Sequence, residues 1–140
     1  MKLQETEIAE RLRTAGLRPT RQRLSLAAIL FGAGDRHVSA ESLHQEALAA
    51  RIHVSLATVY NTLNQFKAVG LLREVAFEGE RTFFDTNTSN HFHYYLEETD
   101  QLVDIGTTEL DVRGLPELPP GTEIDRIDVI VRLKRQAPPA

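Results

Sequence analysis

The chain has no cysteine and no long hydrophobic run. Without cysteine it can form neither a disulfide nor a thiolate metal site. The longest apolar run, Leu24 to Phe31, is too short and too interrupted to cross a bilayer. The first five residues lack the apolar stretch of a secretory signal. A hydrophobic content of 41% in 140 residues is ordinary for a globular protein of one or two small domains. We therefore expect a soluble, cytoplasmic protein without membrane contact.

Charge is distributed unevenly along the chain, although the net charge is only −4. Residues 11–23 contain five arginines and no acidic residue, whereas residues 61–140 carry 14 of the 20 acids. A local basic patch is sufficient for contacts with nucleic acid phosphates, even in a chain that is acidic overall. A solvated helix face would produce a similar run of charge, so this feature leaves both interpretations open.

The first half of the chain predicts four helices. The first covers residues 3–14 and ends before Gly16, and the others have Thr20, Ser39 and Ser55 as N-caps. In the fourth helix, which ends at Gly70, an apolar stripe is predicted from Leu56, Val59, Leu63 and Phe66. The opposite face is polar and nearly uncharged, with Tyr60 at its border; it comprises Ala57, Thr58, Asn61 and Gln65. Such side chains can donate to and accept from DNA base edges, although an ordinary amphipathic helix is the simpler alternative.

Strand patterns follow these helices. Residues 71–77 and 82–85 predict a hairpin around the turn Glu78-Gly79-Glu80, which makes a winged helix-turn-helix with Arg81 as the cation of the wing. Residues 92–97, 101–105 and 124–133 predict three further strands. Three strands form too thin a sheet to stand alone, so pairing with a second copy in a homodimer is the economical arrangement.

Several motifs resemble the ferric uptake regulator superfamily. They are Gly16-Leu17-Arg18-Pro19-Thr20-Arg21-Gln22-Arg23, His37-Val38-Ser39-Ala40-Glu41, Leu56-Ala57-Thr58-Val59-Tyr60, Leu63-Asn64-Gln65-Phe66, Phe77-Glu78-Gly79 and His91-Phe92-His93. The resemblance implies an α+β protein: an N-terminal winged helix-turn-helix domain over residues 1–84, and a small C-terminal α/β dimerisation domain over residues 85–140. It implies a metal-dependent transcription factor, not an enzyme.

The arginine cluster, the polar face of the fourth helix and the wing predict contacts with a double-stranded DNA operator. Arg18, Arg21 and Arg23 would hold phosphates or enter a minor groove, and Arg81 would lie over flanking phosphates. The major groove would be met by Ser55, Thr58, Tyr60 and Asn61 on the fourth helix.

The segments Ser55 to Phe66, Phe84 to Asn87 and His93 to Glu97 are most similar to the iron response regulator branch of this superfamily. That branch controls haem synthesis and iron uptake genes, and haem releases its members from DNA. The short Cys-Pro haem motif of some members is absent here, which leaves imidazole ligation by His91 or His93 as the route for haem.

A metal site is expected around His91 and His93. Two histidines at i and i+2 on a strand point to the same face, about 6.5 Å apart, so both imidazoles can meet one ion. The resemblance adds His37 and Glu78 to this site, with Asp104 as a further carboxylate. Such ligands suit iron, manganese or zinc without choosing among them. The Cys-x-x-Cys pairs of many relatives are missing, and Pro116, Pro119 and Pro120 shorten the helix expected in the second domain.

Two other functions agree with part of this pattern. His91-x-His93 followed by Glu97 imitates the ligand motif of a small cupin-like metal enzyme, but such a fold needs about eight strands. A metal-buffering module without DNA binding leaves the arginine cluster and the polar face of the fourth helix unexplained.

Overall fold

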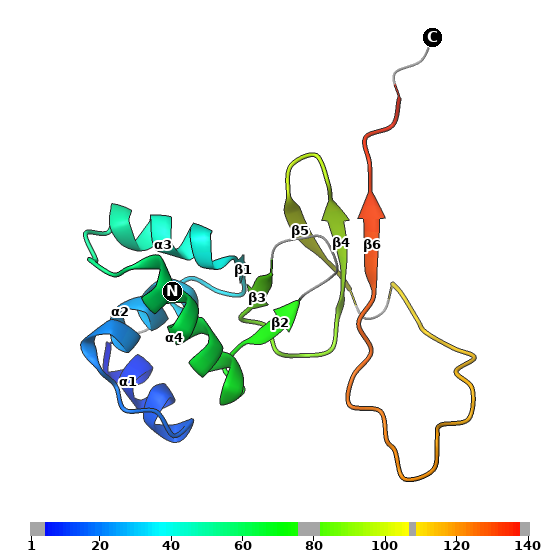
Figure 1. Cartoon of the computed structure of the whole chain (residues 1–140), viewed down its shortest axis with the longest axis horizontal. Coiled ribbons are helices and arrows are strands. Elements are labelled where there is room, and N and C mark those ends of the chain that lie inside the picture. The colour runs from blue at the N-terminus through cyan, green and yellow to red at the C-terminus, as the bar shows by residue number, and fades with distance from the viewer. Residues whose placement is uncertain (1–4, 76–81, 107–108, 138–140) are drawn as a thin grey trace. The chain divides into compact units, whose positions relative to one another are not determined.

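The computed structural model describes residues 5–75, 82–106 and 109–137. The chain forms two compact units, Met1–Thr88 and Ser89–Ala140 (Figure 1). The first unit contains the helices and a small sheet, and the second contains a separate sheet. None of the described helices is long and apolar enough to cross a membrane.

The first unit contains four described helices, as the sequence predicts: α1 (Glu5–Thr14), α2 (Arg21–Phe31), α3 (Ala40–Ala49) and α4 (Leu56–Ala68). The three predicted N-caps are confirmed, because the side chains of Thr20, Ser39 and Ser55 each accept a backbone N–H from the first turn of their helix. Gly70 has φ +81 just after α4, a conformation that suits glycine as a helix stop.

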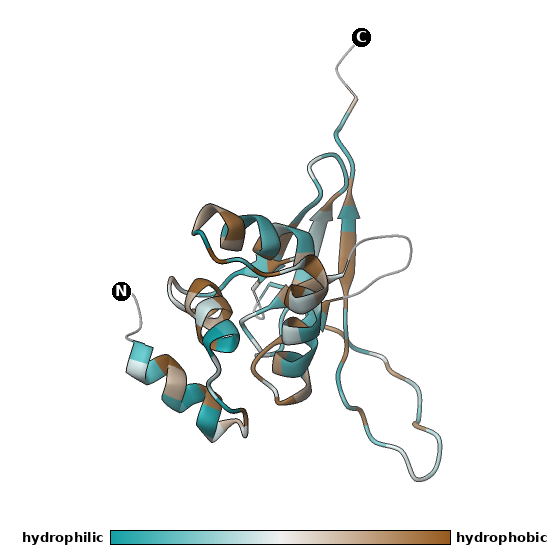
Figure 2. Ribbon diagram, turned by 60° about the vertical axis from the view of Figure 1, so that its left-hand side comes forward, coloured by the Kyte–Doolittle hydropathy of each residue, from teal (hydrophilic) through white to brown (hydrophobic). Residues whose placement is uncertain are grey.

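The core of this unit lies between the helices, where their apolar stripes meet (Figure 2). Val59, Leu63 and Phe66 of α4 have no exposed surface, and the ring of Phe66 packs 6.1 Å from that of Phe31 on α2. One predicted core residue is wrong: Leu56 is 42% exposed. Leu56 is the first residue of α4, at the end of the helix where neighbouring helices no longer cover it.

A three-stranded antiparallel sheet completes the first unit, with the order β1 (His37–Val38), β3 (Phe83–Asp85) and β2 (Arg73–Val75). The predicted pairing of the two later strands is confirmed. β1 was not predicted from the sequence, because a strand of two residues leaves no alternating pattern and exists only through its pairing with β3. The predicted turn at residues 78–80, and with it Glu78 and Arg81, lies outside the described residues.

The second unit contains β4 (Phe92–Leu96), β5 (Gln101–Ile105) and β6 (Ile130–Leu133). β4 is central, antiparallel to β5 and parallel to β6. The first two strands confirm the sequence prediction. The third is shorter than predicted: residues 124–129 are not part of a strand, because the parallel pairing with β4 begins only at His93 and Ile130, one residue after β4 starts.

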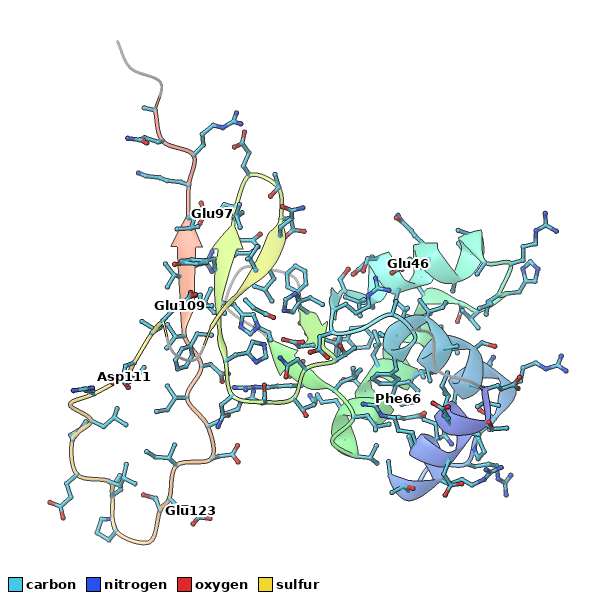
Figure 3. All side chains as sticks on the ribbon, turned by 180° about the vertical axis from the view of Figure 1, so that it is seen from behind. Glu46, Phe66, Glu97, Glu109, Asp111 and Glu123 are labelled. Carbon is cyan, nitrogen blue, oxygen red and sulfur yellow. The ribbon has the colours of Figure 1, made fainter. Side chains whose placement is uncertain are left out.

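The segment between β5 and β6 is irregular. In the described residues of the second unit there is no helix, so the helical part of the expected α/β domain is not found there. Prolines at 116, 119 and 120 remove backbone donors and restrict φ, which explains why no helix forms. Glu109, Asp111 and Glu123 lie along this segment (Figure 3), and most of its residues are exposed.

Candidate metal centre and nucleic-acid interface

Three potential metal ligands meet at one end of the second unit's sheet. His93 on β4 lies directly opposite Asp104 on β5, and His91 immediately precedes β4. Asp104 Oδ1 is 3.3 Å from His91 Nε2 and 3.4 Å from His93 Nε2. Both histidines are buried, and their ring centroids are 4.5 Å apart. The structure thus brings together three residues that the sequence predicted as ligands.

The orientation of His91 favours metal binding. Its Nδ1 lies 2.7 Å from the carbonyl oxygen of Ser89. A carbonyl can only accept, so Nδ1 carries the donated hydrogen, and Nε2, which faces Asp104, is the nitrogen left to bind an ion through its lone pair. A bare imidazole nitrogen and a carboxylate oxygen repel each other at this separation unless a proton or a cation lies between them. A backbone carbonyl that orients a ligating histidine in this way is a common support of metal sites.

A second histidine and carboxylate pair lies within the first unit. His37 on β1 is paired across the sheet with Asp85 on β3, and His37 Nε2 is 3.1 Å from Asp85 Oδ2. Asp85 is almost completely buried, and its Oδ1 accepts the backbone N–H of Asn87 at 2.9 Å. Asp85 therefore joins His37 as a candidate ligand.

Asp85 was not predicted as a ligand from the sequence. Asp85 stood only within the family motif Phe84 to Asn87, and the expected pairing partner of residues 82–85 was the preceding strand. Asp85 could have been recognised as a candidate ligand only with knowledge of β1, because that strand places His37 opposite Asp85.

A polar hollow of about 560 Å³ lies between the start of α2 and the outer face of α4. Its lining includes Arg18, Thr20 and Arg23 from the α2 side, and Thr58, Asn61 and Gln65 from α4. Four of the residues that the sequence analysis assigned to DNA thus share one surface within the first unit. The hollow combines guanidinium groups with uncharged donors and acceptors, a combination that suits a phosphate backbone beside base edges.

The remaining predicted DNA contacts are placed differently. Arg21 is exposed at the first turn of α2. The Ser55 hydroxyl caps α4 and also donates to Thr58 Oγ1 at 2.9 Å, so its described contacts stabilise the helix start. Tyr60 is 45% exposed, and its ring meets that of Phe84 edge-on at 6.4 Å.

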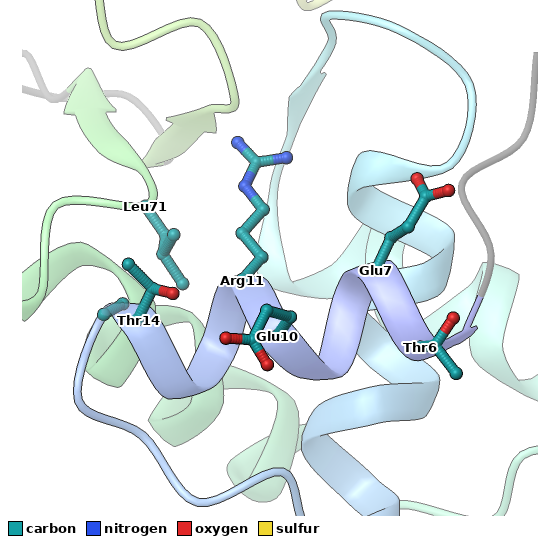
Figure 4. Close-up of a pocket in the computed structure, with 7 residues that line it drawn as sticks. Thr6, Glu7, Glu10, Arg11, Thr14 and Leu71 are labelled. Atoms are coloured by element: carbon teal, nitrogen blue, oxygen red, sulfur yellow. The ribbon is translucent and has the colours of Figure 1, made fainter.

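Another hollow, of about 730 Å³, lies along α1 (Figure 4). Its lining includes Glu7, Glu10, Arg11 and Leu71. Arg11 belongs to the basic run, but its guanidinium carbon lies 4.3 Å from the ring centroid of the core residue Phe31. The two carboxylates would repel phosphate, so this hollow is a poor candidate for a nucleic-acid interface.

Comparison with known proteins points to one family. Residues 14–124 match the ferric uptake regulator family. The chain is similar to the peroxide-responsive repressor PerR of Staphylococcus epidermidis, with 34% identity over 100 residues. That match covers 71% of this chain and 66% of the relative, so the chain matches slightly less than two thirds of the relative's length.

Solved structures show the same likeness. The ferric uptake regulator of Pseudomonas aeruginosa with manganese has 28% identity and a TM-score of 0.70, over 91% of this chain and 97% of that one. The Vibrio cholerae ferric uptake regulator has a TM-score of 0.72 over 91% of this chain and 98% of that one. At 22% identity, the similarity to the Vibrio cholerae protein indicates a shared fold alone.

Proposed function

The chain belongs to the ferric uptake regulator family, and from this premise we propose that it is a transcriptional regulator whose DNA binding is controlled by a divalent metal ion. The observation that carries the proposal is the convergence of His91, His93 and Asp104 on one point of the second sheet. The arginines and the polar face of α4 in the first unit supply the surface for DNA.

We propose that the ion is held by His91, His93 and Asp104 together with His37, and that Asp85 is a further carboxylate ligand. Glu78 stays a prediction from the family resemblance. Imidazole and carboxylate ligands suit iron, manganese and zinc, so the ligand types do not select one metal. Because His37 belongs to the first unit and His91 and His93 to the second, an ion bound by all three would tie the units together. Metal would thereby fix the placement of two α4 helices in a dimer.

We propose that the first unit is a winged helix-turn-helix and that α4 enters the major groove of an operator. Two copies of the chain, paired through the second unit, would present two such helices to a twofold operator. Thr58, Tyr60 and Asn61 would face base edges. Arg18, Arg21 and Arg23 would hold phosphates, and Ser55 would fix the start of the helix. The protein binds and releases DNA and has no catalytic role in this scheme.

Replacing Arg18 with alanine is expected to weaken binding to every duplex sequence, because a phosphate contact carries no base information. The slope of log affinity against log salt should become shallower by about 1. Fluorescence anisotropy of a labelled operator and a random duplex, at several salt concentrations, measures both quantities. An unchanged salt slope would remove Arg18 from the phosphate contacts.

Replacing Asn61 with alanine is expected to act differently. Loss of a base contact should cost about 1–3 kcal/mol on the operator, and relax sequence preference at one base pair, while leaving random DNA nearly unaffected. The same anisotropy assay with single-base operator variants detects this. Equal losses on operator and random DNA would contradict a base-reading role for Asn61.

The proposed regulation is tested by titrating metal-free protein into a labelled iron-control operator duplex, then repeating with Mn(II) and with haem. The resemblance to the iron response regulator branch leads us to propose that metal sustains binding and haem, bound through His91 or His93, releases it. Binding that requires metal and ignores haem would instead indicate a regulator that uses metal as its only effector. Binding unaffected by either would contradict effector control.

A second candidate function is release of DNA by peroxide. The similarity to a protein named as a peroxide-responsive repressor favours it. Adding hydrogen peroxide to the Fe(II)-loaded complex, with the Mn(II)-loaded complex as control, separates this function from haem control. Loss of binding only in the iron complex supports peroxide sensing, and equal behaviour of the two complexes argues against it.

A further inference from the structure

The guanidinium group of Arg23 is held in a defined orientation by two groups of the first unit. Its Nε and Nη2 both donate to the side-chain oxygen of Gln65 on α4, at 3.2 and 3.1 Å. Its Nη1 donates to the backbone carbonyl of Arg18 at 3.0 Å. Arginine has five N–H donors in a rigid fork, so these contacts use three of them and leave two for a ligand.

This arrangement changes the interpretation of Gln65. The side-chain oxygen of Gln65 already accepts two hydrogen bonds from Arg23, so it has little capacity left for a base edge. The sequence pattern alone placed Gln65 with Thr58 and Asn61 on a face able to contact bases. In the structure Gln65 differs from Thr58 and Asn61, because its side-chain oxygen is paired with Arg23, a cation on α2.

We propose that Gln65 is a positioning residue for DNA binding, which orients Arg23 toward a backbone phosphate in the polar hollow beside α4. The inference rests on the proposed DNA binding but assigns a role that this proposal does not contain. Arg23 is a long side chain with several rotatable bonds, and ordering it on binding would cost conformational freedom. Gln65 and the Arg18 carbonyl impose that order before DNA arrives, which is preorganisation of the contact.

The contact between Gln65 and Arg23 also links phosphate binding to base reading on this surface. Gln65 and Asn61 are four residues apart, so they lie one above the other on the same face of α4. Arg23 is in the first turn of α2, and its backbone N–H donates to the side chain of the cap Thr20. A phosphate held by Arg23 is therefore kept at a set distance from the base that Asn61 would contact. The Gln65 and Arg23 pair thus sets the register between backbone contacts and base contacts.

Gln65→Met tests this role, because methionine keeps the length of the side chain and removes the acceptor. We expect binding to operator and random duplex to weaken equally, by roughly 3- to 10-fold, from the cost of ordering one long side chain. The salt slope should stay as in the unaltered protein, because Arg23 keeps its charge. Arg23→Met should weaken binding and also reduce the slope by about 1.

A double-mutant cycle then isolates the positioning role. In an Arg23→Met background, Gln65→Met should cause no further loss, because the group it orients has gone. Gln45→Met, at an exposed position of α3, is the matched control and should bind like the unaltered protein. Circular dichroism checks that each variant is folded, which is expected since Gln65 is exposed.

Three results would overturn the inference: full affinity in Gln65→Met, losses that add in the double variant, or a change of preference at a single base pair. The last would make Gln65 a base-contacting residue. Failure of the unaltered protein to bind any duplex would instead refute the proposed DNA binding itself, so the two failures are distinguishable.

Discussion

Asp104→Asn is expected to lower metal affinity by about 100-fold. This is the upper end of the range seen when groups that only support a metal ligand are removed. Asp104 Oδ1 faces the Nε2 atoms of both His91 and His93, so it is the carboxylate that would share an ion with these two histidines. Asparagine has nearly the same shape but no charge. Competition with a chromophoric chelator, using Mn(II) and Zn(II), measures the loss.

The control for this variant is Asp128→Asn. Asp128 is also an exposed acid of the second unit, but it pairs with Arg126 at 3.0 Å, and the described structure does not place it with the ligand group. It should keep full metal affinity. If Asp104→Asn binds metal as tightly as Asp128→Asn, the ion is held elsewhere. A combined His91→Ala and His93→Ala variant should then also retain metal, which would remove the effector site from the second unit.

Phe66→Ala is expected to destabilise the first unit by about 3–5 kcal/mol, the usual cost of deleting a large buried aromatic side chain. Phe66 has no exposed surface, points in among the helices and packs against Phe31 (Figure 3). Its removal leaves a cavity that the surrounding helices can fill only in part. Urea denaturation followed by the helical circular dichroism signal measures the change in unfolding free energy.

Leu56→Ala is the matched control on the same helix. The heptad-like spacing of Leu56, Val59, Leu63 and Phe66 gives both residues the same expected burial, yet Leu56 is 42% exposed. Its replacement should change the free energy of unfolding by no more than about 0.5 kcal/mol. An equal loss of unfolding free energy in the two variants would mean that Leu56 is buried in solution. The exposure of Leu56 described here would then be wrong.

Local features of the protein were predictable because they depend on neighbours in the chain. The caps Thr20, Ser39 and Ser55 act on N–H groups within the next turn, and the glycine after α4 relieves strain at its own position. His91 and His93 come close because residues two apart in an extended segment point to the same side, and His91 directly precedes β4. The four helices, β4 and β5, and the closeness of His91 to His93 could therefore be inferred without a structure.

Features that depend on distant partners were not predictable. The strand β1 and the pairing of His37 with Asp85 arise when segments nearly fifty residues apart form one sheet. The same holds for Gln65, whose side-chain oxygen is occupied by an arginine 42 positions earlier in the chain. Residues 124–129 show the converse, since their alternating pattern finds no neighbouring strand.

The sequence by itself thus determined the helices, the pair of neighbouring histidines and the family of the protein. Tertiary structure decided which polar groups meet: Asp104 with two histidines, Asp85 with His37, and Gln65 with Arg23. The physical reason is range. Capping and periodicity act within a few residues of the backbone, whereas burial and hydrogen bonding of side chains depend on surfaces that come together only when the chain folds.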